Sequence, residues 1–489
     1  MDSTRQGSIY NNTSDLQNGS YDVLCIGSGW AGRSLAAKVA REGLTALVVD
    51  EDLIGGECPF YACIPSKALL RSSEALDAAF AVDGAKQRIT NPKVDVAAVF
   101  QRRDMLVSNY DDNQVLVPMV LKSGVDLLRG RGKLAGEKKV EVTSADGKSI
   151  ILEARTAVAL CTGSSPKIPD IPGLAQCNPW SPRDATGAKH APETLLILGA
   201  GVAGCEMATA YTHFGTKVIL VGSSDRILPK VEKKAGDIVK QALQNQHVEV
   251  LPETKLTNVE RVDSDTINVK TSTGQSFQVS QILVAAGRHA NTKGIGLEAV
   301  NLPGDGSLIN VDDSLLVQGV PGKWLYALGD INGRAPLTHM CKYHGRIAAS
   351  AILKNLGKEA PLAHSAAIAD HHATPSVVFT WPQVATVGLT QDEAARKGIK
   401  AKFIESSLFT VGSLIHGIPP DEGWASWVID EESQRLLGMT LVGRDVGEII
   451  HAATVAIVGG LTLQQLAHAI PSFPTISEVF LNLLESAGF

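Results

Sequence analysis

Two cysteines, Cys58 and Cys63, are the residues of this 489-residue chain that point most directly to chemistry. Four residues separate them, and one helical turn can bring such a pair onto one face, close enough for a disulfide. Lys67 follows Cys63 by four residues on the same helical face, where its charge would stabilise a thiolate. In a cytosolic protein such a pair is more often redox-active or metal-binding than structural.

Zinc binding is the rival interpretation of this pair. A closed zinc site needs four ligands, and no second Cys/His pair at ligand spacing occurs, since His371 and His372 are adjacent. An odd number of cysteines, seven, without a secretion signal also argues against a disulfide framework. We expect a cytoplasmic protein with a redox-active dithiol and no metal site.

Two segments have the strand, glycine turn, helix and strand pattern of a dinucleotide-binding βαβ unit. The first starts at Tyr21 and carries Gly27, Gly29 and Gly32 in its turn, with Asp50 ending the second strand. Such glycines permit a tight turn and close approach of a pyrophosphate, whose charge the helix N-terminus stabilises, and the acid accepts a hydrogen bond from a ribose hydroxyl. The segment therefore predicts a dinucleotide site.

The second unit carries Gly199, Gly201 and Gly204 in the same context. At the position where the first unit has its acid, the second has Gly222, so the carboxylate that would hold a ribose 2′-hydroxyl is missing. Arg226 follows and either accommodates a 2′-phosphate or is a surface residue. The pattern favours NADPH over NADH.

Composition limits the class of protein. With 44% hydrophobic residues, 20% charged residues and a net charge of −6, the chain is typical of a globular protein and offers no surface for nucleic acid. No apolar run reaches the roughly 18–20 residues that span a bilayer, so we expect no membrane insertion. Residues 1–20 are polar and are interpreted as a disordered lead-in.

Several motifs follow one another from Tyr21 over nearly the whole chain: GSGWAG, GGEC-PFYA-CIPSK, CTGSSP, GAGVAGCE, AAGR and ALGD. In this order they resemble those of the pyridine nucleotide-disulfide oxidoreductases, the family of dihydrolipoamide dehydrogenase, glutathione reductase and mercuric reductase. The resemblance implies an α/β fold with two Rossmann-type domains, for FAD and NAD(P), and a C-terminal α+β dimerisation domain. The expected boundaries are 21–165 with 290–365 for FAD, 166–289 for NAD(P) and 366–489 for the interface.

The same resemblance implies roles for single residues. Cys63 would face the flavin, Cys58 would exchange with the substrate, and Glu206 would pair with Lys67 near the flavin. The C-terminal domain would form a homodimer and complete each active site from the partner chain. The residues implied to contact FAD are Gly27, Gly29, Gly32, Asp50, Lys67, Gly132, Thr162, Gly163, Asp330 and Thr338, and those implied to line the NAD(P) site are Gly199, Gly201, Gly204 and Gly287.

One departure from the family pattern concerns the general acid–base dyad. Disulfide reductases of the family carry a His-Pro pair and a Glu five residues after the His, whereas this chain has Phe473 in place of the His and retains Glu478. Phenylalanine cannot transfer a proton, and a general acid–base contributes roughly 10²- to 10⁴-fold in rate. Glu478 is then either catalytic or a solvated or capping carboxylate, and His468 is the first alternative base to test.

We therefore predict an FAD- and NADPH-dependent oxidoreductase, with NADH as the alternative nucleotide, whose cysteine pair serves an atypical small molecule such as a specialised metabolite or a quinone-like compound. Phe60 and Tyr61, between the cysteines, would face an apolar substrate or pack in the core. Mercuric reductase-like metal reduction is an alternative, although no cysteine follows Cys341. Dihydrolipoamide dehydrogenase-like exchange, a flavin dehydrogenase or oxidase, and a non-enzymatic redox sensor are the others.

Overall fold

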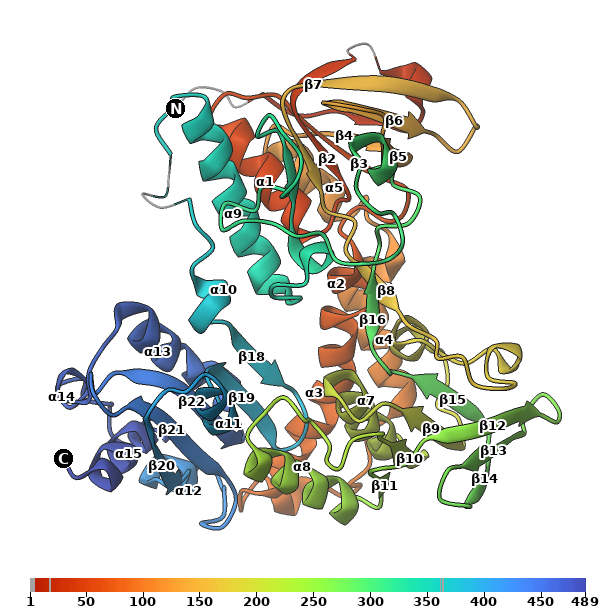
Figure 1. Ribbon diagram of the computed structural model, residues 1–489. Coiled ribbons are helices and arrows are strands. Elements are labelled where there is room, and N and C mark those ends of the chain that lie inside the picture. Colours follow the sequence, from red (N-terminus) through yellow and green to blue (C-terminus); the bar gives the residue numbers. More distant parts are fainter. Residues whose placement is uncertain (1–4, 17–18, 361, 363–364) are drawn as a thin grey trace. The chain divides into compact units, whose positions relative to one another are not determined.

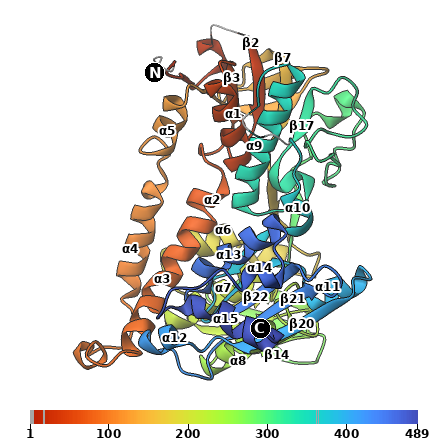
Figure 2. The same cartoon turned by 90° about the vertical axis from the view of Figure 1, so that its left-hand side faces the viewer.

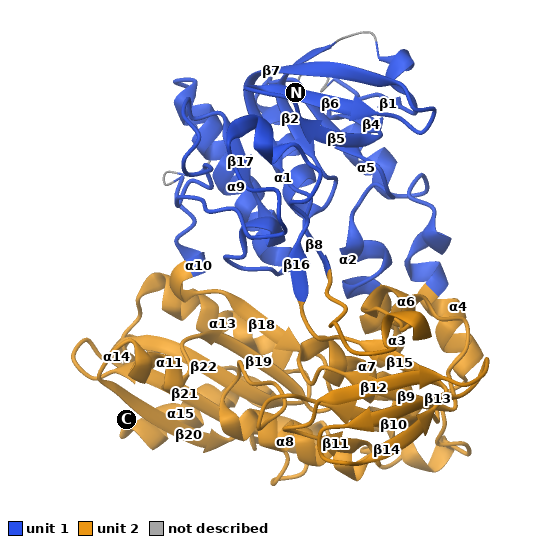
Figure 3. Cartoon of the chain, turned by 45° about the vertical axis from the view of Figure 1, so that its right-hand side comes forward, with its two compact units in different colours: residues 1–64, 104–165, 288–370 blue, residues 65–103, 166–287, 371–489 orange. Residues whose placement is uncertain are grey.

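The computed structural model describes residues 5–16, 19–360, 362 and 365–489. The chain divides into two compact units (Figure 3). Unit 1 comprises residues 1–64, 104–165 and 288–370, and unit 2 comprises residues 65–103, 166–287 and 371–489. Because each unit is assembled from three separate segments, the chain passes repeatedly from one to the other.

Unit 1 is built around an eight-stranded sheet with the order β1-β4-β3-β2-β7-β6-β5, in which β17 also pairs with β7. Strands β4, β3, β2 and β7 are mutually parallel, and β5 and β6 are antiparallel to their neighbours. The strands are β1 (Ile9–Tyr10), β2 (Ser20–Ile26), β3 (Ala46–Asp50), β4 (Asp126–Arg129), β5 (Arg131–Leu134), β6 (Lys139–Thr143), β7 (Ser149–Leu160) and β17 (Leu325–Ala327).

Strand β2 is buried on both faces, which is why its sequence is an almost continuous apolar run. Val23 and Cys25 belong to the core formed with α1 (Trp30–Arg41) and α9 (Thr338–Asn355), whereas Leu24 and Ile26 belong to the core on the opposite face. The helices α1 and α9 lie side by side (Figure 1) because Gly345 lets them approach: a Cβ there would lie 2.6 Å from Cβ of Ser34.

Part of the predicted lead-in is ordered. Strand β1 pairs in parallel with β4 at the edge of the sheet. Arg5 Nη2 lies 2.6 Å from Asp126 Oδ2, and the backbone N–H of Ser8 donates to Asp126 Oδ1 at 2.8 Å. Asp126 is fully buried and needs such partners, and they fix residues 5–16 in place. Residues 1–4 and 17–18 lie outside the described residues.

Unit 2 contains a second parallel sheet, with the order β11-β10-β9-β15, and a three-stranded antiparallel sheet, β12-β13-β14. The strands are β9 (Thr194–Leu198), β10 (Lys217–Val221), β11 (Glu249–Leu251), β12 (Leu256–Arg261), β13 (Ile267–Thr271), β14 (Ser276–Val279) and β15 (Gln281–Val284). The associated helices are α6 (Pro182–Gly187), α7 (Val202–His213) and α8 (Lys233–Asn245).

Two long helices cover α7 within unit 2. Helix α3 (Cys63–Phe80) begins in unit 1 and continues in unit 2, where it runs beside α4 (Val96–Leu106) (Figure 2). Leu69 of α3, Phe100 of α4 and Tyr211 of α7 share one hydrophobic core. The middle of helix α3 is therefore packed against α4 and α7 within unit 2.

The C-terminal part of unit 2 is a five-stranded antiparallel sheet with the order β18-β19-β22-β21-β20. Several large apolar side chains are exposed there, including Val455, Val458, Ile470 and Phe473. The predicted α/β class with an α+β C-terminal domain is confirmed. The elements are β18 (Pro375–Val378), β19 (Gln383–Gly388), α11 (Gln391–Arg396), β20 (Ala401–Ser407), α12 (Val411–Ile415), β21 (Trp424–Asp430), β22 (Leu436–Gly443), α13 (Val446–Gly459), α14 (Leu463–Leu466) and α15 (Val479–Ala487). None of the described helices is both long and apolar enough to cross a membrane.

Candidate active site

The first glycine turn has the backbone that a pyrophosphate site needs. Gly27 has φ of +105°, and a Cβ there would lie 2.3 Å from the carbonyl oxygen of Cys161. A Cβ on Gly32 would lie 2.2 Å from the carbonyl oxygen of Gly27. Nothing lies within 4 Å of a Cβ on Gly29, the N-cap of α1, so the space beyond this helix N-terminus is open. The turn therefore fits the pyrophosphate of a dinucleotide such as FAD.

Asp50 ends β3 and directs its carboxylate back toward this turn. Its Oδ2 accepts from the backbone N–H of Ser28 at 2.6 Å, and its Oδ1 accepts from that of Asp52 at 3.0 Å. Burial raises the pKa of Asp50, and the hydrogen bonds from Ser28 and Asp52 act in the opposite direction. The carboxylate is thus fixed at the strand end where the sequence predicted ribose binding.

Other predicted FAD contacts lie at the carboxyl ends of the same parallel strands. A Cβ on Gly132 would lie 3.2 Å from Ile26 and 3.3 Å from Val49, at the ends of β2 and β3. Thr162 follows β7 and donates through Oγ1 to the carbonyl of Asn291 at 2.8 Å. The structure therefore brings Gly132 and Thr162 to the same edge of the sheet as the first glycine turn and Asp50.

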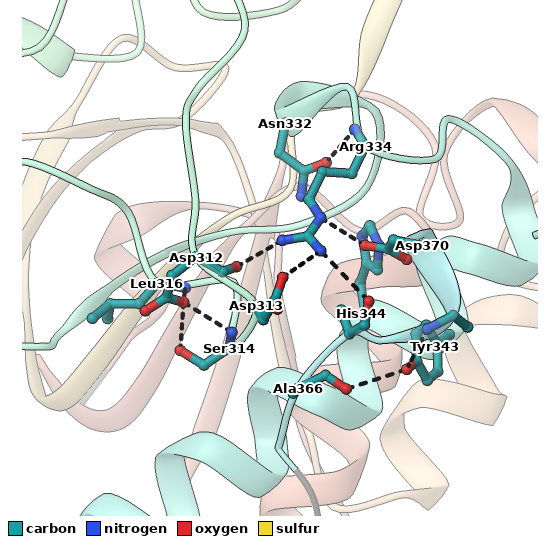
Figure 4. Close-up of polar contacts among 12 residues, drawn as sticks. Asp312, Asp313, Ser314, Leu316, Asn332, Arg334, Tyr343, His344, Ala366 and Asp370 are labelled. Carbon is teal, nitrogen blue, oxygen red and sulfur yellow. Dashed lines mark hydrogen bonds and ion pairs between the residues drawn. The ribbon is translucent and has the colours of Figure 1, made fainter. Parts of the chain in front are cut away.

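Asp330 follows β17 at this edge, and its Oδ2 accepts from Ser164 Oγ at 2.6 Å. A buried network fixes the main chain just before it (Figure 4). The N–H of Gly329 donates to His344 Nδ1 at 3.1 Å, so Nε2 carries the proton and donates to Asp370 at 3.0 Å. Asp370 in turn lies 2.8 Å from Arg334 Nε. Sequence reasoning missed this network because its members are far apart in the chain.

The two cysteines begin consecutive helices. Cys58 lies in α2 (Glu57–Phe60), Cys63 is the first residue of α3, and both are free thiols. Thr338 Oγ1 lies 3.1 Å from Cys63 Sγ, so a residue predicted to contact FAD also contacts the dithiol. Among the described residues no group of three His, Cys, Asp or Glu side chains could hold a metal ion.

The surroundings of Cys58 favour its thiolate. Its pKa is lowered to about 6, chiefly by a hydrogen bond from Cys63. Hydrogen bonds involving Thr338 and Trp30 and the positive charge of Arg33 act in the same direction, while burial opposes them. These surroundings therefore favour the thiolate form of Cys58, which is the form that attacks a disulfide.

Lys67 and Glu206 form an ion pair within unit 2. Lys67 Nζ lies 2.8 Å from Glu206 Oε2, and the Glu206 side chain is almost fully buried. The remaining oxygen, Oε1, accepts from the backbone N–H of Phe379 at 3.0 Å, and Lys67 Nζ lies 4.6 Å from the centroid of the Phe379 ring. The pairing implied by the sequence resemblance is present, and the ammonium group is held in one position.

The second glycine turn repeats the geometry of the first. Gly199 has φ of +118°, and a Cβ on Gly204 would lie 1.8 Å from the carbonyl oxygen of Gly199. Nothing lies within 4 Å of a Cβ on Gly201, the N-cap of α7. Gly287, with φ of +113°, also has open space around its Cβ position. These four residues fit a second dinucleotide.

Gly222 stands where the first unit has Asp50. Besides lacking a carboxylate, this position leaves little room for any side chain. A Cβ on Gly222 would lie 2.9 Å from Cβ of Ala200, so a side chain there requires the turn to shift. Arg226 donates to the carbonyl of Pro229 at 3.1 Å and lies 3.9 Å from Asp392, with its side chain 19% exposed. Arg226 is therefore a partly buried residue with its own contacts.

Phe473, which stands in place of the family's histidine, faces solvent in the single chain. Phe473 is 72% exposed. Glu478 makes no helix-capping hydrogen bond, and its Oε2 is buried without a hydrogen-bond partner among the described residues. His468 is exposed, and within the described part of the chain no hydrogen bond or ion pair joins it to Glu478. Glu478 is thus neither fully solvated nor a cap.

Several side chains around the dithiol were not singled out from the sequence. Trp30 follows Gly29 and Arg33 follows Gly32, and the sequence signal that could have found them is a large aromatic and a charged side chain at the start of a phosphate-binding helix. Between the cysteines, Phe60 is buried and packs in the core, whereas Tyr61 is half-buried and stacks on Tyr110.

Comparison with known proteins agrees with this geometry. Residues 21–345 match the family described as pyridine nucleotide-disulphide oxidoreductase, and residues 374–484 match its dimerisation domain. The chain is 31% identical over 465 residues to the dihydrolipoyl dehydrogenase of Chlorobaculum tepidum, covering 94% of this chain and 95% of that one. It is 28% identical over 466 residues to the mercuric reductase of Staphylococcus aureus, covering 94% and 81%.

Solved structures share the fold at lower identity. The HOCl-induced flavoprotein disulfide reductase RclA from Escherichia coli, solved as a Cu(II) complex, has a TM-score of 0.81 at 21% identity, covering 95% of this chain and 99% of that one. LpdA from Mycobacterium tuberculosis has a TM-score of 0.81 at 24% identity, with the same coverage. Together with the family match over most of the chain, these findings show that the protein is an enzyme of the pyridine nucleotide-disulphide oxidoreductase family.

Proposed function

We propose that this enzyme passes electrons from NADPH through FAD to the Cys58/Cys63 pair, and from there to an atypical small-molecule acceptor. The observation that carries the proposal is the hydrogen-bonded dithiol, in which the pKa of Cys58 is lowered to about 6. When bound, FAD supplies the hydride acceptor that links the nucleotide to the dithiol. Cys63, which contacts Thr338, is the thiol on the flavin side, and Cys58 is the one that meets the acceptor.

The ion pair of unit 2 has a positioning role in this proposal. Glu206 holds the Lys67 ammonium through one oxygen and is itself held through the other by the backbone of Phe379. A cation fixed in this way would stabilise negative charge on a bound flavin. The turns at Gly27 and Gly199 would bind the two pyrophosphates.

NADPH is the proposed nucleotide because no carboxylate stands at Gly222 to hold a 2′-hydroxyl or repel a 2′-phosphate. Gly222→Glu alone would strain the turn, because its Cβ would meet Ala200. The sharper variant is therefore Gly222→Glu with Ala200→Gly, with Ala200→Gly alone as the control. We expect the double variant to shift the ratio of kcat/KM for NADPH and NADH toward NADH. Equal use of both nucleotides by the unmodified enzyme would contradict the proposal.

The acceptor is proposed to be atypical because Phe473 replaces the acid–base imidazole. The lowered pKa of Cys58 removes the need for a base to form the attacking thiolate, so the missing group matters for protonating the leaving thiol. Rapid-mixing experiments should show NADPH reducing the enzyme quickly and the reduced enzyme accumulating when lipoamide or oxidised glutathione is the sole acceptor. Quinones, which take electrons from the flavin, should turn over.

Phe473→His tests the same point by restoring the imidazole. We expect lipoamide turnover to rise while the rate of reduction by NADPH stays unchanged. His468→Ala serves as the matched control, since His468 makes no contact with Glu478 among the described residues. If the unmodified enzyme already reduces lipoamide as fast as NADPH reduces it, and His468→Ala abolishes this, then His468 is the base and the proposal of an atypical acceptor fails.

A further inference from the structure

The segment that carries Cys58 lies directly on the start of α1. A Cβ on Gly56 would lie 2.9 Å from Cα of Gly29, so the two backbones are in contact. Arg33 Nη2 donates to the carbonyl of Gly55 at 3.3 Å, which joins the second turn of α1 to the same segment. Trp30, the first residue of α1, is consequently a neighbour of the Cys58 sulfur and contributes a hydrogen bond to it.

Two cations lie over the Trp30 ring. Lys342 Nζ is 3.7 Å from the ring centroid, and Arg33 Cζ is 4.4 Å from it. Lys342 reaches this point because α9 contacts α1 at Gly345, one turn later, where a Cβ would lie 2.9 Å from the carbonyl oxygen of Ala31. Trp30 and Lys342 are both half-buried, so a small molecule in solvent can reach them.

Neither cation is held in a close ion pair, although the charges of the Cys58 thiolate and the Asp50 carboxylate act on Arg33 from a distance. Among the described residues no carboxylate forms an ion pair with Lys342 or Arg33. Arg33 is only 5% exposed, and its Nε has no hydrogen-bond partner. Burial lowers the pKa of Arg33 to about 10, which reflects the cost of holding this charge away from water. Cys58 and Asp50 offset part of this cost for Arg33. Lys342 has no such carboxylate among the described residues, so a bound anion beside it would stabilise both cations.

An aromatic pair follows Cys58 closely in the chain. Tyr61, three residues after Cys58, is stacked on Tyr110 with ring centroids 5.8 Å apart and an interplanar angle of 23°. Ser108, Asn109 and Tyr110 all have φ between +50° and +62°, which non-glycine residues rarely adopt in succession. The chain therefore holds Tyr110 against Tyr61 despite an unfavourable backbone, as is typical of functional sites.

We propose that Lys342 and Arg33, held over Trp30, bind the negatively charged group of the acceptor that reacts at Cys58, and that this acceptor is an anionic aromatic disulfide. The inference rests on the proposed function for the source of electrons. The anion site selects the charge, and the Tyr61/Tyr110 pair accommodates the flat ring.

The reaction balances with the groups present. The Cys58 thiolate attacks one sulfur of the acceptor, forms a mixed disulfide and releases the first aromatic thiolate. Cys63, after losing its proton to solvent, attacks Cys58 Sγ, re-forms the Cys58–Cys63 disulfide and releases the second thiolate. The acceptor gains two electrons, which NADPH supplied to the dithiol. Aromatic thiols are acidic leaving groups that depart without a proton donor, which fits the absence of an imidazole at Phe473.

The test uses FAD-loaded enzyme reduced chemically with dithionite and two probes that share an aromatic disulfide core. Dithiobis(nitrobenzoate) carries carboxylates, and dithiodipyridine is neutral. Single-turnover rates of Cys58 oxidation are measured for the unmodified enzyme and for Lys342→Met. We expect Lys342→Met to slow the reaction with dithiobis(nitrobenzoate) about tenfold, as loss of a charged hydrogen bond does, and to leave dithiodipyridine unchanged.

Lys354→Met is the matched control, because Lys354 is exposed at the far end of α9 and its loss changes the net charge equally. It should alter neither rate. As a measurement that needs no variant, added salt should slow the unmodified enzyme with the anionic probe only. Equal loss with both probes, no loss with either, or a salt effect shared by both would overturn the anion site.

Two further measurements distinguish this inference from FAD binding by the same cations and from the proposed function. Bound FAD is measured in Lys342→Met, because a pyrophosphate is also an anion; loss of FAD would assign the cations to FAD and overturn the proposal for the acceptor. NADPH-driven turnover of both disulfides is measured in the unmodified enzyme. If NADPH drives neither while the dithionite-reduced enzyme still shows the charge selectivity, the proposed function fails and the anion site stands.

Discussion

The two glycine turns of this enzyme have nearly the same backbone and differ at the end of the strand that follows. Gly27 and Gly199 both have strongly positive φ, and in each turn the third glycine packs against the carbonyl of the first. The first unit then ends its strand in Asp50, which accepts two backbone hydrogen bonds. In the second unit Gly222 directly follows the strand, and even a Cβ there would crowd Ala200.

This difference separates what is common to dinucleotide binding from what distinguishes the two ligands. The pyrophosphate needs close approach to backbone N–H groups, so glycine recurs at the same positions. The ribose is recognised by a side chain, so the two units diverge there.

The largest effect should come from filling the third glycine of each turn. Gly32→Val would drive a side chain into the carbonyl of Gly27, and Gly204→Val into that of Gly199. We expect Gly32→Val to give colourless protein without FAD, whereas Gly204→Val should stay yellow but lose more than 1,000-fold in its rate of reduction by NADPH. Absorbance spectra and rapid mixing with NADPH distinguish the two.

The paired design contains its own control, since each substitution places the same side chain in an equivalent turn. Dithionite should still reduce the flavin of Gly204→Val, which shows that the FAD site is intact. If both variants lose FAD, the two turns are not independent sites, and the assignment of a separate dinucleotide to each turn is wrong.

A smaller effect is expected at Glu206, on the helix that follows the second turn. Glu206→Gln keeps an acceptor for the N–H of Phe379 but removes the charge that holds Lys67. The rate of flavin reduction by NADPH should fall about 10- to 100-fold, the range expected for a charged hydrogen bond, with FAD content unchanged. Glu193→Gln, an exposed acid before β9, should have no effect. An unchanged reduction rate in Glu206→Gln would remove the ion pair from the mechanism.

Asp50 provides the corresponding test in the first unit. Asp50→Ala leaves the N–H of Ser28 without its acceptor and removes the proposed ribose contact. The Kd for FAD, measured by flavin fluorescence, should rise about tenfold or more, while reduction by NADPH of the FAD-saturated variant stays normal. Asp52→Ala, at an exposed neighbour, should retain FAD. Similar FAD affinities in both variants would show that Asp50 does not hold the ribose.

The smallest effect concerns how fast Cys58, near the first glycine turn, and Cys205, near the second, react with an alkylating agent. Because the pKa of Cys58 is about 6, its thiolate falls from most of the population at pH 7 to about one tenth at pH 5. Alkylation of the reduced enzyme by iodoacetamide should therefore slow about tenfold between pH 7 and pH 5. Cys63→Ala removes the chief cause of the lowered pKa and should move the midpoint upward. Cys205 of the second unit, whose pKa burial raises, should stay unmodified, as peptide mapping would show.

Much of the fold was accessible from sequence because local pattern and tertiary role agree. The glycines, the apolar strands and Asp50 recur at spacings that a βαβ unit requires, and the parallel sheets form at those positions. Residues 5–16 were misjudged because their order depends on a distant buried carboxylate, Asp126, which no local pattern reveals. Polar composition indicates disorder only where no such partner exists.

The sequence by itself determined the two dinucleotide turns, the cysteine pair and the loss of an imidazole at Phe473, because each depends on residue types at short spacing. Only the tertiary structure decided what surrounds Cys58. Trp30 and Lys342 are far apart in the chain, and they meet because Gly345 lets α9 approach α1. The physical reason is that a thiol's ionisation and its choice of partner depend on charges and hydrogen bonds in space, which a linear pattern does not encode.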